Sequence, residues 1–250
     1  MVSIKTAREL SLMKDACRIS AEALRAAGEA VKPGIFTYEI DTIVRKYIEK
    51  QGAKPSFLGY GGFPASACIS VNSVVIHGIP AKTAVLKEGD IVSIDVGAYY
   101  RGFHGDNAYT FPCGKISENA QRLLDATKES LYEGIKQAQA QNRIGDIGSA
   151  VQEYVEARSY SVVRNYTGHG VGAKLHEDPS VPNYGTRGRG FKLLPGMTIA
   201  IEPMVNEGTH HTRVLGDKWT VVTLDGKLSA HFEHTVAITP DGPRILTLCE

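Results

Sequence analysis

Two segments in different halves of this 250-residue chain carry the same pattern of apolar positions, and this repeat limits the fold more than any other feature. Helical spacing predicts a helix from Thr37 to about Gln51, and GDIGSAVQEYVEA at 145–157 repeats its pattern 107 positions later (147 against 40). The matched positions are Ile40 and Ile147, Val44 and Val151, Tyr47 and Tyr154, and Ile48 and Val155. We therefore expect one domain, 1–250, with similar halves at approximately 1–112 and 113–250 related by a pseudo-twofold axis.

The repeat continues into the strands predicted to follow each helix, where it aligns acidic residues. The same offset pairs Asp95 with Glu202, and after a change of register Asp106 pairs with Glu233, 127 positions later (233 against 106). The larger offset implies about 20 additional residues in the second half (127 against 107). We assign them to THHTRVLGDKWTVVTLDGK, which is typical of an added hairpin and contains the only tryptophan, Trp219.

A first helix is predicted ahead of the repeated one. Thr6 and Glu9 have the spacing of a capping box, and apolar residues follow at helical spacing. The helix should stop near Lys32-Pro33-Gly34, because proline and glycine both interrupt a helix.

The strand at 91–100 carries a carboxylate among branched apolar residues. Side chains alternate between the two faces of a strand, so Asp95 shares its face with the small residues Ser93 and Gly97. The residues of the other face are Val92, Ile94 and Val96. Glu202 has the same relation to its apolar neighbours. We expect a mixed α/β fold whose sheet is covered by helices on one face, with the acids in a cavity on the other.

Four carboxylates in one cavity would repel one another and take up protons unless cations held them. An imidazole candidate is His169, in the glycine-rich segment TGHGVG. The predicted ligand set is Asp95, Asp106, His169, Glu202 and Glu233. Oxygen-rich ligands with one imidazole favour manganese, iron(II) or cobalt, and zinc also fits. The alternative is that each acid is a solvated strand residue and that His169 belongs to an ordinary turn.

Composition narrows the function classes. With 28 basic and 27 acidic residues the net charge is +1, which gives no general attraction to nucleic acid or membranes, and no sequence-specific nucleic-acid partner is expected. Four widely spaced cysteines without a CxxC pair indicate neither a zinc cluster nor a disulfide framework. The N-terminus lacks an apolar signal core. A cytoplasmic monomer is therefore expected.

Five segments together resemble one known family. NSVVIHGIP, IDVGAYYRGFHGD, TGHGVGAKLHEDP, IAIEPMV and HFEHTV are similar, in order and spacing over the whole chain, to type I methionine aminopeptidases. The resemblance implies a pita-bread fold with two divalent ions, Asp95 on one, Asp106 and Glu233 bridging, and His169 and Glu202 on the second. It also implies removal of the initiator methionine from nascent polypeptides when the next residue is small.

The resemblance also implies roles for further side chains. A water shared by the two ions would attack the scissile carbonyl, with Glu202 as general base and then acid. His77 would contact the substrate near the scissile amide, and His176 would stabilise the oxyanion. Each of these two histidines could instead be an ordinary turn or surface-loop residue.

An apolar pocket is needed for the substrate methionine. The resemblance assigns its lining to Tyr60, Phe63, Cys68 and Trp219. Tyr60 and Phe63 could instead only anchor their glycine-rich loop. The sequence departs from the family pattern at Phe57, Thr167 and Leu175, which leaves pocket shape and inhibitor selectivity open. A monovalent cation, Na⁺ or K⁺, is implied near Asn72, Val74 and Ser229.

Two other functions remain open from the sequence. One is a Xaa-Pro peptidase of the same superfamily, although such enzymes commonly add an N-terminal domain. The other is a non-catalytic binding module on the same fold. Separately, the loop NYGTRGRGFK carries Arg187, Arg189 and Lys192, which could contact the ribosome through its RNA or could be a solvated turn.

Overall fold

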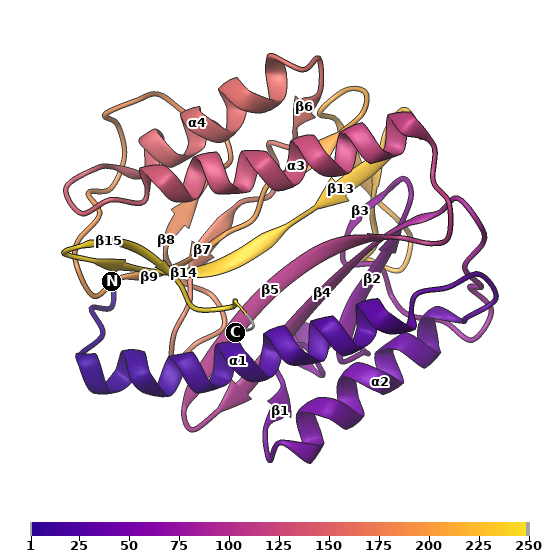
Figure 1. The fold of residues 1–250 in the computed structure, drawn as a ribbon, viewed down its shortest axis with the longest axis horizontal. Helices are drawn as coiled ribbons and strands as arrows, with labels where there is room; N and C mark the ends of the chain where they lie inside the picture. Colours follow the sequence, from indigo (N-terminus) through magenta and orange to yellow (C-terminus); the bar gives the residue numbers. More distant parts are fainter. Residues whose placement is uncertain (1, 249–250) are drawn as a thin grey trace.

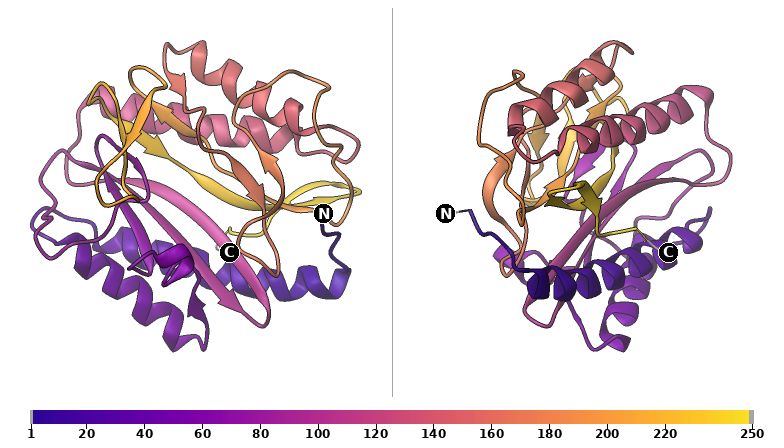
Figure 2. Two further views of the ribbon diagram at one scale, coloured as in Figure 1. Left: turned by 180° about the vertical axis from the view of Figure 1, so that it is seen from behind. Right: turned by 60° about the vertical axis from the view of Figure 1, so that its left-hand side comes forward.

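The computed structural model describes residues 2–248, in which four α-helices pack against one large curved sheet (Figure 1). Two three-stranded sheets and a short 3₁₀ helix, Tyr60–Gly62, complete the described fold. The helices form two pairs, α1 (Ala7–Ala30) with α2 (Thr37–Lys50) and α3 (Glu118–Gln137) with α4 (Ile144–Glu156). Figure 2 shows from behind the face of the sheet that the helices leave open. Within the described residues no helix has the length and apolar composition needed to span a bilayer.

The first two helices begin and end close to the predicted residues. Thr6 caps α1, because its hydroxyl accepts a hydrogen bond from the Glu9 amide and the Glu9 carboxylate accepts one from the Thr6 amide. The helix ends at Ala30, ahead of the predicted stop, and α2 ends one residue before the predicted Gln51. Both predicted helices are confirmed.

The two halves repeat each other down to single backbone contacts. Before α2, Phe36 forms an isolated bridge with Val85, and before α4, Arg143 forms one with Lys192. Each pair lies 107 positions from its counterpart (143 against 36 and 192 against 85). The amides of Phe36 and Arg143 also donate to the carboxylates of Glu39 and Asp146, again at the same offset. The predicted repeat is therefore confirmed as a structural one.

The main sheet has nine strands in the order β1-β4-β5-β14-β9-β7-β8, with β2 on β4 and β15 on β14. Their bounds are β1 Lys54–Pro55, β2 Ala67–Val71, β4 Ile91–Tyr100, β5 Phe103–Pro112, β7 Gly168–Gly170, β8 Glu177–Val181, β9 Thr198–Ile201, β14 Glu233–Thr239 and β15 Gly242–Ile245. All the pairings are antiparallel. The halves meet where β5 pairs with β14.

The contacts between β5 and β14 follow the second predicted offset. Glu233 lies opposite Ala108, while the Thr235 hydroxyl accepts from the amide of Asp106 and donates to its carbonyl oxygen. These two pairs exchange under the offset of 127 (233 against 106 and 235 against 108), as a twofold axis between the strands requires. The pseudo-twofold arrangement of the halves is thus visible in the register itself.

Two apolar clusters place the helices on one face of the sheet. Val92, Ile94 and Val96 pack against α1 and α2, and Ile199 and Ile201 pack against α3 and α4. The predicted strand faces are therefore correct. Since alternate residues point the other way, Asp95 and Glu202 are directed to the opposite face.

The insertion in the second half is a hairpin, as predicted. Strands β11 (Thr212–Val214) and β12 (Val221–Thr223) pair with each other, and β12 also pairs with β3 (Val74–Ile76). Trp219 lies in the turn that connects the two hairpin strands, next to the open face of the main sheet. A second small sheet joins β6 (Ser161–Val162), β10 (Met204–Asn206) and β13 (Ser229–His231).

Candidate metal centre and active site

A cavity of about 160 Å³ opens on the face of the sheet that carries the acids. Its lining is Phe57, Tyr60, Phe63, Cys68, His77, Asp95, Asp106, His169, Leu175, His176, Glu202, Trp219 and Glu233. The structure thus brings together the five predicted ligands, both assigned histidines and the four predicted pocket residues. Thr167 lies outside this described lining, and its hydroxyl contacts Ser180 Oγ at 2.8 Å.

Each of five neighbouring strands contributes one potential ligand. In sheet order, Asp95 lies on β4, Asp106 on β5, Glu233 on β14, Glu202 directly after β9 and His169 on β7. Antiparallel strands lie about 5 Å apart, so groups on one face of neighbouring strands can converge where the sheet curls. The curvature of the sheet brings residues that are 138 positions apart in sequence (233 against 95) to one cavity.

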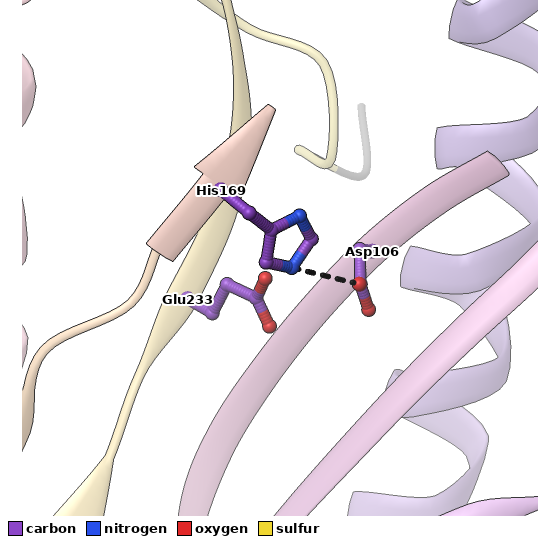
Figure 3. A group of neighbouring side chains, drawn as sticks. All are labelled: Asp106, His169 and Glu233. Carbon is purple, nitrogen blue, oxygen red and sulfur yellow. Dashed lines mark ion pairs between the residues drawn. The ribbon is translucent and has the colours of Figure 1, made fainter. Parts of the chain in front are cut away.

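The ligand atoms of Asp106, His169 and Glu233 all lie within 4.8 Å of one another (Figure 3). His169 Nε2 is 3.8 Å from Asp106 Oδ2 and 3.6 Å from Glu202 Oε1. The other ring nitrogen, Nδ1, is 2.8 Å from the Gly170 carbonyl oxygen and must donate its hydrogen there. In the neutral imidazole Nε2 is then an acceptor facing carboxylates, an arrangement that a shared cation stabilises.

Burial makes this cluster unfavourable as a set of free anions. Asp106 and Glu233 are each 3% exposed, so the alternative of solvated strand residues is wrong for both. Burial raises the pKa of Asp106 to about 7, and burial together with Asp106 raises the pKa values of Asp95 and Glu233 well above their usual range. Burial, and next the negative charge of Asp95, also raise the pKa of Glu202 well above its usual range.

The oxygens of the cluster are also short of hydrogen-bond donors. Asp95 Oδ1 and Asp106 Oδ1 are buried and find no partner in the described part of the chain. Burial lowers the pKa of His169 to about 4, so this side chain is neutral at pH 7 and does not serve as a counter-cation. Orphaned carboxylate oxygens beside a neutral imidazole fit a divalent-cation site.

His77 enters the cavity from a strained turn. Its backbone has φ of 57°, and a Cβ on the following Gly78 would lie 2.2 Å from the Ile69 carbonyl oxygen. Its ring stands edge-on to Trp219, with 6.1 Å between the centroids. Burial lowers the pKa of His77 to about 4. A neutral ring held by a strained backbone at a cavity wall fits a functional residue better than an ordinary turn.

His176 lies at the exposed mouth of the cavity. Its Nδ1 is 2.7 Å from the Tyr60 hydroxyl, and its ring is inclined by 66° to that of His169 with 4.2 Å between the centroids. The imidazole thus sits between a potential metal ligand and a pocket residue.

The apolar end of the cavity is a small buried cluster. Phe63, Cys68 and Leu175 are buried together with Phe57, and Trp219 packs against them. The Phe63 and Trp219 rings meet edge to face at 5.2 Å. Of the three residues at which the sequence departs from the family pattern, Phe57 and Leu175 therefore contribute directly to this wall, and Thr167 does not.

Two residues near Glu202 were not singled out from the sequence. His231 Nε2 lies 3.9 Å from Glu202 Oε2 and has no hydrogen-bond partner among residues 2–248, and Asn183 Nδ2 donates to the Glu202 carbonyl oxygen. His231 lies two residues before Glu233, so strand alternation could have placed it on the same face. Asn183 follows β8 and gives no such signal.

The residues of the expected monovalent-cation site are partly brought together. The Asn72 carbonyl oxygen accepts from the Ser229 amide at 2.9 Å, and Val74 begins β3 nearby in the chain. The ion at this site stays a prediction.

Comparison with known proteins gives the class to which the fold and site belong. The model for "Metallopeptidase family M24" matches residues 11–240. The chain belongs to metallopeptidase family M24 and, within it, to the methionine aminopeptidases, as the relatives below show. The family and the acidic cluster together support the expected binding of divalent metal.

The relatives agree over the whole chain. The chain is 55% identical to the methionine aminopeptidase of Clostridium perfringens, over 99% of both sequences. The crystal structure of methionine aminopeptidase from Thermotoga maritima matches with a TM-score of 0.97 at 48% identity, again over 99% of both chains. The expected pita-bread fold and the expected enzyme class, a hydrolase of this kind, are confirmed.

The prolidase from Pyrococcus horikoshii shares the fold but is a longer protein. It matches with a TM-score of 0.79 at 25% identity, and the match covers 99% of this chain and 64% of the prolidase. The fold is therefore common to prolidases and methionine aminopeptidases. The higher sequence identity to the methionine aminopeptidases places this chain with them.

Proposed function

We propose that the chain removes the N-terminal methionine from nascent polypeptides whose second residue is small, using two divalent ions. The observation that carries this proposal is the division of one cavity into two ends. Carboxylates and an imidazole from five neighbouring strands converge at one end, and an apolar cluster with aromatic walls forms the other. A peptide held by its first side chain at the apolar end would present its first carbonyl at the acidic end.

The charge of the cluster fits two ions rather than one. Four ionised carboxylates carry four negative charges, which two divalent cations neutralise. Asp95 would hold one ion, His169 and Glu202 the other, and Asp106 and Glu233 would bridge them. Manganese, iron(II) or cobalt suits this donor set, and zinc is also accommodated. When bound, the ions would lower the pKa of a shared water and supply the nucleophile.

Glu202 is the proposed general base and acid. Its carboxylate lies 3.6 Å from His169 Nε2 and lines the cavity, so it can take a proton from water there and later return it to the leaving amine. The hydrogen bond from Asn183 to its backbone oxygen helps to fix the segment that carries it.

His176 and His77 would act on the substrate. If the Tyr60 hydroxyl donates to His176 Nδ1, the remaining hydrogen of His176 is on Nε2, where it can be donated to a developing oxyanion. His77 is neutral and lines the same cavity, so it can hydrogen-bond near the scissile amide. Because both rings occupy space beside the reacting carbonyl, a small second residue is favoured.

The apolar end would bind the methionine side chain. Its walls are Tyr60, Phe63, Cys68 and Trp219, and aromatic and sulfur neighbours suit a flexible, polarizable thioether. Phe57 and Leu175 would narrow this pocket and so influence inhibitor selectivity.

Hydrolysis of Met-Ala-Ser, compared with Xaa-Pro peptides, tests the proposal. The protein is stripped with a chelator and then supplied separately with manganese, iron(II) and cobalt. We expect cleavage of Met-Ala-Ser that depends on metal and little cleavage of Xaa-Pro. Preference for Xaa-Pro would favour the prolidase-like alternative, and absence of both metal binding and hydrolysis would favour a binding module.

The cellular setting belongs to the same proposal: a monomer in the cytoplasm that meets chains near the ribosome. Of the loop residues suggested for ribosome contact, Arg187 already pairs with Glu153 at 2.6 Å, which leaves Arg189 and Lys192 to attract RNA. Replacing all three by glutamate should abolish co-sedimentation with ribosomes if the loop makes this contact. Unchanged co-sedimentation would remove the idea.

A further inference from the structure

A lysine from the segment before α1 lies buried beside the loop that carries His176. Lys5 is 6% exposed, although lysine is almost never buried without a partner. Its Nζ donates to Glu177 Oε2 at 2.7 Å, and the side chain of Glu177 is 10% exposed. The two residues are 172 positions apart in sequence (177 against 5), so this ion pair connects the chain's first segment to the site.

The carboxylate of Glu177 is used on both oxygens. While Oε2 accepts from Lys5, Oε1 accepts from the Lys174 amide at 3.1 Å and so closes the turn that contains His176. Although burial opposes ionisation, the hydrogen bond from Lys5 keeps the pKa of Glu177 below its usual value. Glu177 is therefore an anion in a largely buried position, with Lys5 as its counter-charge.

The backbone around the pair is shaped to admit Lys5. A Cβ at Gly172 would lie 2.6 Å from Lys5 Cε and 2.7 Å from Glu177 Oε1, so a larger residue there would have to displace the end of one of these two side chains. The Lys5 amide donates to the Gly196 carbonyl oxygen at 2.7 Å, in the turn that leads into β9 and Glu202. Lys5 thus joins the turn of His176 to the turn before the strand of the proposed base.

His176 depends on its neighbours for its position. The residue is exposed at the cavity mouth, but Leu175 before it is buried in the pocket cluster and Glu177 after it is paired with Lys5. A buried ion pair contributes little net stability, because desolvation of both charges offsets their attraction. Its more useful effect here is geometric, since it fixes one of the two residues between which His176 is held.

We propose that Lys5 is a positioning residue for His176, acting through Glu177. This inference rests on the proposed function, in which His176 faces the reacting carbonyl. A displacement of about 1 Å at such a group can lower a rate by up to about 10²-fold without preventing binding. The segment before α1, far from the acids in sequence, would then be part of the active site's framework.

The test uses the variants Lys5→Met, Glu177→Gln and the double variant, with Arg45→Met as a matched control. Arg45 pairs with Glu49 on the surface of α2, so its loss should leave kcat unchanged. Each single variant should lower kcat on Met-Ala-Ser about tenfold, with KM changed less than about twofold. The kcat of the double variant should fall no further than that of either single variant, because all three variants lack the ion pair between Lys5 and Glu177.

The double variant also guards against misfolding, since it leaves no unpaired buried charge. The proposal would be overturned if the folded double variant had the kcat of the wild type. It would also be overturned if the kcat losses of the two single variants multiplied in the double variant. Hydrogen exchange of the metal-free proteins gives a readout that does not need activity. We expect amides 173–177 to exchange on the order of tenfold faster in Lys5→Met than in the control.

Faster exchange spread evenly over the domain, or none at 173–177, would show that Lys5 has no particular effect on this turn. If the wild type failed to cleave Met-Ala-Ser, the proposed function would fail, while the exchange experiment would still decide whether Lys5 holds the turn.

Discussion

Replacing Asp106 by asparagine should change how the stability of the metal-free protein depends on pH. Burial raises the pKa of Asp106 from 3.8 to about 7, so the folded state binds this proton more tightly than the unfolded state. A raised carboxyl pKa gives a contribution to stability that is fully present below pH 3.8 and is lost as the pH rises through about 7.

The size of the change in unfolding free energy follows from the difference between the pKa of Asp106 in the folded and in the unfolded state. Between pH 5 and pH 7.5 the contribution of Asp106 should fall by roughly 2–3 kcal/mol, because each unit of pKa difference between the folded and unfolded states corresponds to roughly 1 kcal/mol. Buried histidines change stability in the opposite direction over this range, so the wild-type curve alone is not diagnostic. The difference in unfolding free energy between the wild type and Asp106→Asn removes the contribution of distant groups such as the histidines outside the cavity. It reports the Asp106 carboxylate together with the repulsion that its charge exerts on Asp95, Glu202 and Glu233, which acts in the same direction.

Urea unfolding at both pH values, with chelator, measures this difference. The wild type should lose roughly 2–3 kcal/mol relative to Asp106→Asn on going from pH 5 to pH 7.5. With manganese added, the loss should disappear, since a bound cation favours the ionised carboxylate. If the stability of the wild type relative to Asp106→Asn stayed constant or increased as the pH rose, Asp106 would not be held in an unfavourable anionic cluster.

Three further variants test other parts of the account. Glu202→Gln should lower kcat on Met-Ala-Ser by about 10²–10⁴-fold while the folded structure is kept, as judged by circular dichroism; a smaller loss would exclude Glu202 as the base. Trp219→Leu should raise KM for Met-Ala-Ser by about tenfold with less effect on kcat, since the pocket wall binds the methionine; an unchanged KM would place methionine elsewhere. Thr6→Ala should cost about 1 kcal/mol in urea unfolding, and no loss would mean that the cap of α1 is not stabilising.

Much of the fold could be predicted because it depends on local patterns. The capping box at Thr6, the helical spacing in α2 and α4 and the alternation around Asp95 are all written within a few neighbouring residues. The repeat added long-range information, since it assigned the same structure to two halves and exposed the inserted hairpin around Trp219. The order of the strands in the sheet was not predicted, because pairing between strands that are distant in sequence leaves no local signal.

The sequence predicted which acidic residues meet in the cavity, but not the contacts that support them. Asp95, Asp106, Glu202 and Glu233 could be identified because acidic residues align at these positions of the repeat and because each interrupts the apolar pattern of its strand. Lys5 breaks no pattern, as a lysine near a helix start is ordinary, and its partner is fixed only when the sheet curls. The placement of Thr167 outside the cavity lining likewise depends on the local path of the chain before β7.

Carboxylates from both halves of the chain should converge to hold a pair of cations. The most direct measurement is the anomalous scattering from a crystal of the protein loaded with manganese. We expect two peaks, both in contact with Asp106 and Glu233, one beside Asp95 and the other beside His169 and Glu202. A single peak, or peaks only at other sites, would contradict this expectation.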